Sequence, residues 1–488
     1  MKPVKILTAW TIFFFASFND SPGAVYLPVN QTEYQFIYDL SRRAEISGGY
    51  NDCFFSVAPY DFEKINLNYP LAGLTSGLDN SHISTFAFLT EDFRSAKYER
   101  RQGYESIRGG VIAQPYPRLF IYSNFLLDEK MHDDPDYGGK KWRGLAGEIE
   151  NSYVAYDAGK LDILLGRFSS FWGPENRSLI LSSTARPMDA LNLRFQWKKL
   201  HFTYQFGKLS RVDTTLTSGA FENRFFAGHR IDFKPIGNLR IGLFETIIFG
   251  GPGRSVDLTY LNPIMFYHAA QLNENVDDNT FLGLDFDWYI RNRHKLYGQL
   301  MVDDMQVDDK AIGDQEPDEI GYQIGFSSID VFGELDLSFE YLKITNRTYN
   351  QKLPRNRYEN RGELIGHAFG SDGDRLQMII THWFDLDKKC ALEIAYQRHG
   401  EGKYDADWTE PWEEYDGDYT EPFPTGRVEK SLKSSLHAAG FYNDIAFVDL
   451  EAGLQHVKNY QNIPGDTRTI PFVNLRLSLI AHHLFNFD

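Results

Sequence analysis

The sequence predicts an all-β protein: a transmembrane antiparallel β-barrel of about 18 strands with a short helical N-terminal segment. Three observations predict this fold. Apolar and polar residues alternate along many segments, tight links between these segments alternate with long ones, and the last segment ends in aromatic side chains. Outer-membrane barrels share the first two features and have an even number of strands.

Composition excludes several other classes. The chain has 488 residues, a formal net charge of −17 and 42% hydrophobic residues. A polytopic helical membrane protein needs repeated apolar spans of about 20 residues, which the sequence lacks. The negative charge argues against a nucleic-acid binder, because such proteins carry a basic surface. A mean hydropathy of −0.41 fits a soluble all-β protein, and it also fits a barrel in which only alternate residues face lipid.

Residues 1–24 have the pattern of a signal peptide. Lys2 and Lys5 precede an apolar run from Ile6 to Phe18, and small residues follow. The run is about 13 residues long, which is short for a membrane span. We therefore expect export. Export would allow a disulfide between the two cysteines at 53 and 390, although the sequence does not show that they meet.

Residues 25–83 form the predicted helical segment. Asn30, followed three residues later by Glu33, is typical of a helix start with a capping box. Apolar side chains then recur at helical spacing until two glycines end the helix: Tyr34, Ile37, Tyr38, Ala44, Gly48 and Gly49. A second short helix is expected after Pro59. We place this segment in the periplasm, because both ends of an even-stranded barrel lie on that side.

Residues 84–488 form the predicted barrel. One segment is apolar at every second position from Leu282 to Ile290, and Asp285 and Asp287 lie between the apolar positions. Such a strand has one oily face and one carboxylate-bearing face, which fits a lipid-facing exterior and a wet lumen. It fits a soluble sandwich less well, because strands there are usually shorter and share an apolar interior.

The connections support the barrel more strongly. Tight links are expected near 114–117, 157–160, 197–200, 234–238, 292–294, 328–331, 384–388 and 442–444. Long links are expected near 129–143, 168–189, 209–222, 250–278, 304–318, 347–373, 401–427 and 459–467. A further hairpin is expected near Gln102–Gly103. Since outer-membrane barrels have short periplasmic turns and longer outer loops, the long links are expected outside the cell.

The last expected strand carries an alternating apolar row from Val473 to Phe487, with Asp488 after the final aromatic residue. A last strand ending in aromatics resembles the terminal signal that the barrel assembly machinery of the outer membrane reads. We therefore expect that machinery and outer-membrane lipid among the partners of the chain, and we expect no nucleic acid.

Several motifs resemble those of the capsule assembly Wzi family. The longest runs from Gly166-Arg167 through Trp172-Gly173-Pro174 and Ser178 to Arg186-Pro187, and a second, at 257–263, contains Tyr260, Asn262 and Pro263. A third lies at 366–374. The resemblance covers roughly residues 26–488, with Glu175 standing where a common family pattern has glycine.

This resemblance implies an 18-stranded outer-membrane barrel with a helical N-terminal segment. It implies a non-catalytic surface lectin that attaches or organises capsular or other surface polysaccharide on the cell exterior. Two alternatives remain open: a porin-like channel for small solutes, favoured by the polar alternate rows, and a barrel hydrolase. The sequence lacks the common nucleophile, zinc-protease, phosphate-loop and dinucleotide motifs, so we expect neither an enzyme nor a cofactor.

The candidate polysaccharide-binding residues are aromatic. Five lie among many carboxylates in the long link 401–427: Tyr404, Trp408, Trp412, Tyr415 and Tyr419. Aromatic faces stack on sugar rings and carboxylates accept hydroxyl hydrogen bonds, although a solvated acidic loop with interfacial aromatics fits equally well. Trp172 is the sixth candidate, for which a structural turn is the favoured reading.

No metal site is expected. Four aspartates at 303, 304, 308 and 309 offer oxygen ligands suited to Ca²⁺, but their spacing is not that of an EF-hand. A solvated acidic loop is the favoured reading of this segment.

Overall fold

The computed structural model describes residues 25–48, 54–65, 70–75, 78, 82–97, 101–134, 137–213, 221–306, 315–415 and 418–486. The predicted signal peptide, Cys53, Asp308 and Asp309 lie outside these ranges. In the described part, Cys390 is a free, half-buried cysteine.

Eighteen long strands form a closed antiparallel barrel, as predicted. They are β2 (His82–Ala96), β3 (Gln102–Tyr116), β4 (Leu119–Asp128), β6 (Leu145–Asp157), β7 (Leu161–Phe168), β9 (Met188–Trp197), β10 (Leu200–Asp213), β11 (Phe221–Ile236), β12 (Leu239–Gly251), β13 (Asn279–Ile290), β14 (His294–Asp304), β15 (Glu319–Ser328), β16 (Leu335–Ile344), β19 (Gly373–Asp385), β20 (Lys388–His399), β21 (Glu429–Tyr442), β22 (Ala446–Lys458) and β23 (Thr467–Asn486).

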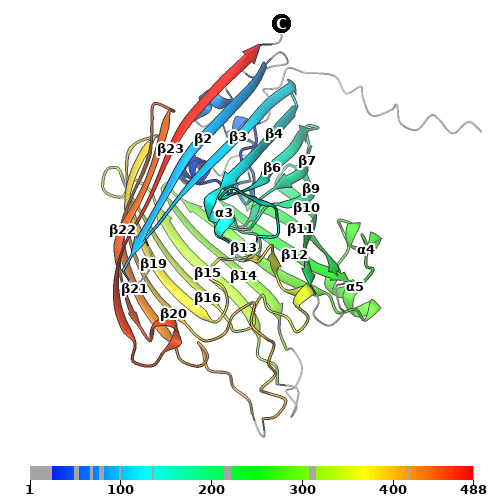
Figure 1. Cartoon of the computed structure of the whole chain (residues 1–488). Coiled ribbons are helices and arrows are strands. Elements are labelled where there is room, and N and C mark those ends of the chain that lie inside the picture. Colours follow the sequence, from blue (N-terminus) through cyan, green and yellow to red (C-terminus); the bar gives the residue numbers. More distant parts are fainter. Residues whose placement is uncertain are drawn as a thin grey trace, which may run out of the picture.

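The first and last strands close the barrel. β2 pairs with β23 from His82 opposite Asn486 to Ala96 opposite Phe472, so both chain ends of the barrel lie at the end with the tight turns. This is the upper end in Figure 1, and the long loops lie at the lower end. The hairpin predicted near Gln102–Gly103 joins β2 and β3: Gln102 begins β3 and Gly103 pairs with Phe93, so the link lies between Ala96 and Gln102.

The two faces of the strands differ as the alternation predicts. On β13, Leu282, Leu284 and Trp288 are exposed on the outside, whereas Asp285 and Asp287 are fully buried inside. The expectation of a wet lumen is wrong at this wall, because these carboxylates contact buried arginines rather than water.

Two buried arginines neutralise this part of the wall. Arg230 donates to Asp285 at 2.6 Å and to Asp232 at 2.9 Å. Arg240 donates to Asp287 and to Asp285, each at 2.6 Å. Buried charges are tolerated when they are paired and hydrogen-bonded in this way.

Helix α1 (Thr32–Gly48) lies inside the barrel near the tight turns (Figure 1). Phe36 packs edge-on against Trp383, Phe441 and Phe447, and Tyr34 packs against Phe88 and Tyr122 on other strands. Because α1 touches widely separated strands, it occupies much of the lumen at this level, and a cavity of about 400 Å³ remains between it and the wall.

The expected capping box is wrong. Asn30 Oδ1 has no hydrogen-bond partner among the described residues. The Ser478 hydroxyl donates to Glu33 Oε1 at 2.7 Å, and Arg108 lies 3.7 Å from the same carboxylate. Glu33 therefore ties the helix to the barrel wall.

Shorter elements complete the structure. Near the tight turns lie β1 (Val57–Ala58), α2 (Phe62–Ile65) and η1 (Ala72–Leu74), and the expected short helix after Pro59 corresponds to α2. The long loops contain α3 (Glu129–Asp133), β5 (Lys141–Trp142), β8 (Phe171–Trp172), α4 (Leu258–Leu261), α5 (Tyr267–Glu274), η2 (Pro354–Asn356), β17 (Glu359–Asn360), β18 (Glu363–Leu364) and η3 (Tyr460–Asn462). Within the described ranges, no helix is long and apolar enough to cross a membrane.

Candidate functional site

The loop between β20 and β21 is anchored at both ends by one carboxylate. The backbone N–H groups of Gly402 and Thr425 each donate to Asp372 at 2.8 Å, and the Thr425 hydroxyl donates to the same side chain. Asp372 immediately precedes β19 and has a φ of +61°. One strand start thus fixes the entry and the exit of the loop that carries most of the candidate binding residues.

Four aromatic side chains of this loop gather into one group. The ring centroids of Trp408 and Trp412 lie 6.5 Å apart, those of Trp412 and Tyr419 6.4 Å, and those of Tyr415 and Tyr419 5.5 Å. We call Trp408, Trp412, Tyr415 and Tyr419 the aromatic cluster. Trp412 is 4% exposed and Tyr415 is 49% exposed, so the cluster has a buried base and an accessible edge.

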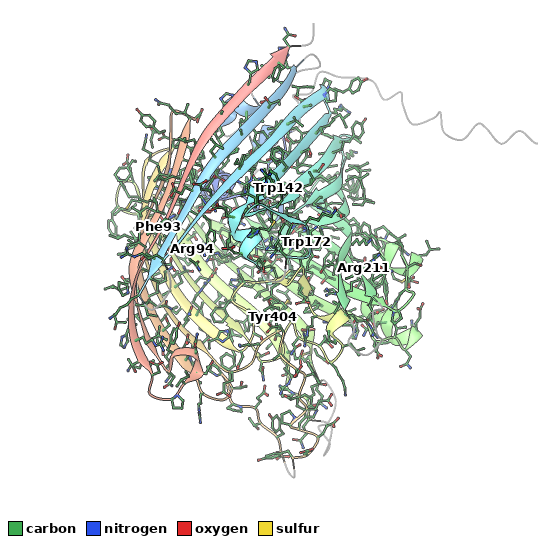
Figure 2. All side chains as sticks on the ribbon, in the orientation of Figure 1. Phe93, Arg94, Trp142, Trp172, Arg211 and Tyr404 are labelled. Carbon is green, nitrogen blue, oxygen red and sulfur yellow. The ribbon has the colours of Figure 1, made fainter. Side chains whose placement is uncertain are left out.

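The fifth candidate binding residue of the loop, Tyr404, lies apart from the cluster. The Tyr404 hydroxyl donates to the carbonyl of Gly362, at 3.1 Å, in the loop between β16 and β19. Burial raises the pKa of Tyr404 to about 12, so its hydroxyl stays protonated. Figure 2 shows Tyr404 on the side of the long loops.

An arginine from another loop holds the cluster together. The Arg347 guanidinium lies 4.7 Å from the ring centroid of Trp412 and 6.0 Å from that of Trp408. It also donates to Glu421 at 2.7 Å and to the carbonyl of Thr409 at 3.2 Å. A cation over an aromatic face is favourable, and more so when partly desolvated. Arg347 could not be identified as part of the site from the sequence, because no motif in its own segment points to sugar binding.

Beside the aromatic cluster, part of the negative charge of the β20–β21 loop is neutralised by an ion pair. Glu410 accepts hydrogen bonds from Lys352 Nζ and from Trp408 Nε1, each at 2.9 Å. These bonds lower the pKa of Glu410. The Asp405, Asp407, Glu413 and Glu414 side chains are exposed. The aromatic cluster therefore lies between paired and solvated carboxylates, which are acceptors for sugar hydroxyl groups.

Trp172 lies elsewhere and is fully buried inside the barrel (Figure 2). Its backbone N–H donates to the Leu181 carbonyl at 3.0 Å, and β8 pairs with β1 of the N-terminal segment. The next residue, Gly173, has a φ of +147°, and a Cβ there would lie 2.8 Å from Gln299 Nε2. Trp172 is thus a packing residue of a tight turn and does not reach a polysaccharide outside the barrel.

The profile of the family described as capsule assembly protein Wzi matches residues 117–470. The chain belongs to the Wzi capsule assembly family. No match emerges among curated protein sequences.

The structure of Escherichia coli Wzi, titled as an outer-membrane protein involved in group 1 capsule assembly and a carbohydrate-binding β-barrel, is similar to this chain. The likeness covers 94% of this chain and 99% of that one, with 14% identity and a TM-score of 0.61. At this identity it establishes the barrel fold. OccD3 (OpdP) of Pseudomonas aeruginosa matches with 11% identity over 83% of this chain and 93% of its own, with a TM-score of 0.46.

The residues around Trp172 whose pattern resembles the Wzi family build the interior of the barrel. The Pro174 carbonyl accepts from Lys295 Nζ at 2.8 Å and from Arg42 of α1. The Ser178 hydroxyl donates to the Trp172 carbonyl, and Ser178 lies 3.0 Å from Gln299 Oε1. The motif therefore links helix α1, the β7–β9 loop and the barrel wall.

Other family-motif residues fix this loop at its ends. Gly166 has a φ of +136°, and a Cβ there would lie 2.2 Å from the Ser152 carbonyl oxygen. Arg167 donates twice to Asp189 at 2.8 Å. Arg186 lies 3.7 Å from Glu148, and the Pro187 carbonyl accepts from Asn360 at 3.3 Å.

The second segment that resembles the Wzi family, residues 257–263, lies outside the barrel. The Tyr260 hydroxyl donates to Asp278 at 2.8 Å, and Asn262 ends α4 and accepts from the N–H of Ile264 at 3.2 Å. Pro263 follows as a half-buried residue. None of the three lies in the β20–β21 loop.

The loop between β16 and β19 covers the buried motif. The Tyr349 hydroxyl donates to the Leu179 carbonyl at 2.6 Å, and the Tyr358 hydroxyl donates to the Ile180 carbonyl at 2.9 Å. His367 is buried, and its Nδ1 accepts from the N–H of Phe369 at 3.0 Å. Burial lowers the pKa of His367 well below its usual value, and two nearby arginines lower it further, so the ring is neutral.

The acidic segment after β14 does not assemble a metal site in the described part of the chain. No group of three His, Cys, Asp or Glu side chains in those ranges is placed to hold an ion. Asp303 instead accepts the N–H of Tyr349 at 2.7 Å, so it helps to anchor the β16–β19 loop.

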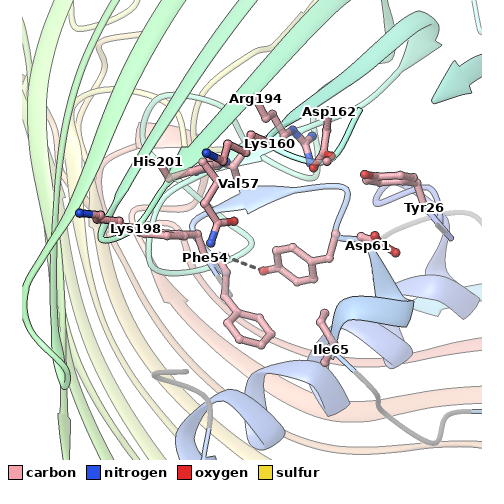
Figure 3. Close-up of a pocket in the computed structure, with 14 residues that line it drawn as sticks. Tyr26, Phe54, Val57, Asp61, Ile65, Lys160, Asp162, Arg194, Lys198 and His201 are labelled. Carbon is pink, nitrogen blue, oxygen red and sulfur yellow. Dashed lines mark hydrogen bonds between the residues drawn. The ribbon is translucent and has the colours of Figure 1, made fainter. Parts of the chain in front are cut away.

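A cavity of about 580 Å³ lies at the opposite end of the barrel (Figure 3). It lies between the N-terminal segment and the turns before β7 and β10, and charges of both signs line it, among them Asp61, Asp162, Lys160, Lys198 and Arg194. It is separate from the aromatic cluster and shares no residue with it.

Proposed function

We propose that this member of the Wzi family is a non-catalytic, lectin-like outer-membrane protein that attaches or organises capsular or other surface polysaccharide on the cell exterior. One observation carries the proposal: four aromatic side chains are fixed by Arg347 among carboxylates, at the end of the barrel that bears the long loops. The similarity to E. coli Wzi, which is described as a carbohydrate-binding β-barrel, supports it.

The chemistry of the aromatic cluster suits sugar binding. The accessible faces of Tyr415, Tyr419 and Trp408 offer flat apolar surfaces for the C–H faces of pyranose rings. The exposed carboxylates of Glu413 and Glu414 accept hydroxyl hydrogen bonds beside these rings. Trp412 serves as the base of the cluster, because its ring is buried under Arg347.

A channel for small solutes is less well supported. Helix α1 occupies much of the lumen near the tight turns, and the β7–β9 and β16–β19 loops pack on one another inside the barrel. The polar rows that favoured a channel consist of inward-facing side chains, and some of these form ion pairs with one another, such as those of Arg230 and Arg240.

The test uses cells in which the gene is deleted and then complemented with the wild-type gene or with a variant. Deletion should release capsule into the medium without reducing its synthesis, and the wild-type gene should restore attachment. A double variant, Trp408→Ala with Tyr415→Ala, should fail to restore it. Tyr442→Ala is the matched control, since Tyr442 is an exposed aromatic residue at the tight-turn end. Full attachment with the double variant present at wild-type level would contradict the proposal.

Binding and location are tested separately with purified protein. A glycan array should return binding that the double variant loses and Tyr442→Ala keeps. N-terminal sequencing of protein from the outer-membrane fraction should find a chain that begins after residue 23 or 24. The barrel should run differently in detergent gels before and after boiling, and a mobility that never changes would count against a transmembrane barrel.

A further inference from the structure

The segment between β12 and β13, residues 252–278, folds back over the outside of the barrel. We call it the α4–α5 hairpin; Figure 1 shows it beside β11 and β12. The N–H groups of Tyr267 and His268 donate to Glu245, on the outer face of β12, at 3.0 and 2.7 Å. The Tyr204 hydroxyl of β10 donates to the Tyr260 carbonyl at 3.1 Å. The hairpin is therefore fixed to the wall.

The hairpin covers side chains that continue the lipid-facing rows. On β12, the outward residues Ile241 and Leu243 are exposed, whereas Ile247 and Phe249 are fully buried. The buried pair packs with Phe225 and Ala227 of β11 and, on the hairpin, with three residues: Tyr260, Tyr267 and Ala270.

The exposed part of this wall is too short to span the apolar layer. From Leu239 to Leu243 a strand covers about 14 Å, or about 10 Å along the membrane normal at a tilt of about 45°. The apolar band of such barrels is about 25 Å tall. On β23, by contrast, the outward row from Val473 to Phe485 covers about 41 Å of strand, or about 29 Å along the normal. The α4–α5 hairpin thus lies at the height of the missing half of the band.

The outer surface of the hairpin is apolar. Leu258 is 82% exposed, Ile264 76%, Phe266 73% and Leu272 67%. Phe266 is the N-cap residue of α5 and Leu272 lies within the helix, and both are exposed, whereas Tyr267 and Ala270 pack on the barrel. Arg254 is paired with Asp257 and Asp278, whereas Glu274 and Asp277 at the end of the hairpin are exposed. Several large, strongly exposed apolar side chains in one short segment mark an interaction site.

We propose that the α4–α5 hairpin is a membrane anchor whose four exposed apolar residues, Leu258, Ile264, Phe266 and Leu272, insert among the acyl chains of the outer leaflet. The occupant is lipid, because the hairpin continues the lipid-facing rows of two neighbouring strands and supplies the apolar height that β12 lacks. It holds the long-loop end of this wall against the membrane, which fixes the orientation of the neighbouring outer loops.

The test places a nitroxide label on single cysteines in the full chain, with Cys53 and Cys390 changed to serine. The protein is reconstituted in phosphatidylethanolamine–phosphatidylglycerol vesicles. Labels at Phe266→Cys and Leu272→Cys should be several-fold more accessible to oxygen than to a water-soluble nickel complex, as at the lipid-facing reference Leu243→Cys. The aqueous reference is Glu413→Cys, an exposed position of the β20–β21 loop.

Two results would overturn the proposal. Labels on the hairpin that match Glu413→Cys would place its apolar surface in water. Labels accessible to neither reagent would indicate a protein partner or a second copy, and the protein mass in nanodiscs would distinguish these two.

The unsubstituted protein provides a second measurement that needs no variant. A lipid-soluble carbene reagent in the same vesicles should modify the peptide 258–272 as well as the strand peptide 282–288. Modification of the strand peptide alone would overturn the proposal.

Discussion

Replacing Arg347 by methionine tests how the aromatic cluster is built. The change keeps the length of the side chain and removes its charge. In the structure the guanidinium stacks on Trp412 at 4.7 Å and donates to Glu421 at 2.7 Å. The two side chains of this ion pair are only 7% and 12% exposed, so water does not replace the lost contact easily.

The expected magnitude follows from these two contacts. A partly desolvated cation–π contact contributes about 1–2 kcal/mol. A hydrogen bond between charged groups contributes about 1.5–3 kcal/mol. Because both contacts share one side chain they do not add fully, and we take about 3 kcal/mol for the stability of the arranged cluster. If the ligand binds only this arrangement, its apparent affinity falls by roughly ten- to one-hundredfold.

The assay is binding of surface polysaccharide, extracted from the host cell, to purified full-length protein by biolayer interferometry. Lys352→Met is the matched control: Lys352 contacts Glu410 beside the cluster, but its side chain is 67% exposed. Such a surface pair contributes little, so the control should change affinity less than about threefold. Arg347→Met with wild-type affinity and an intact heat-dependent gel shift would refute the argument that Arg347 arranges the cluster.

Three further predictions concern the interior. Lys295→Met removes a buried cation that lies 3.4 Å from Glu45 and 3.3 Å from Asp287, so stability should fall by about 3–5 kcal/mol, seen as a lower temperature for the gel-mobility shift. His367 has a lowered pKa in the folded state, so its contribution to stability is complete above about pH 6.5 and falls by up to about 1.4 kcal/mol per unit below it. Hydrogen exchange in residues 345–372 should therefore speed up between pH 7.5 and 5.5 in the wild type, after correction for the intrinsic rate, and much less in His367→Gln. Reconstituted protein should pass almost no current in planar bilayers, whereas a steady open-channel current would show that α1 and the loops leave a passage.

Much of the barrel could be predicted because its signals are local. A period of two along each strand separates an outer apolar row, such as Leu282 and Leu284, from inner carboxylates such as Asp285. Tight turns then alternate with long loops, and that alternation gives the strand number. The link predicted near Gln102–Gly103 lies a few residues earlier, before Gln102, because glycine also occurs within strands and the periodicity does not mark where β2 ends.

The inside of the barrel could not be predicted, because its contacts join distant segments. Glu33 has the spacing of a capping residue, yet it pairs with Ser478, which is 445 residues away. The candidate site likewise has one part that the sequence predicts and one part that it does not. The aromatic residues of the β20–β21 loop are close in sequence and could be grouped, but the cation that arranges them, Arg347, is 74 residues from its partner Glu421.

The structure bears on how a negatively charged chain could bind an acidic polysaccharide. A net charge of −17 and a loop rich in carboxylates suggest repulsion of an acidic capsule. Beside the aromatic rings, however, Glu410 is paired with Lys352 and Glu421 with Arg347, so the excess charge is on exposed groups such as Glu413 and Glu414. Repulsion by solvated groups is screened over about 8 Å at physiological ionic strength, whereas stacking of sugars on aromatic rings does not depend on salt. Added salt should therefore strengthen the binding of an acidic polysaccharide and leave that of a neutral one unchanged. The salt dependence thus indicates which kind of polymer the aromatic cluster holds.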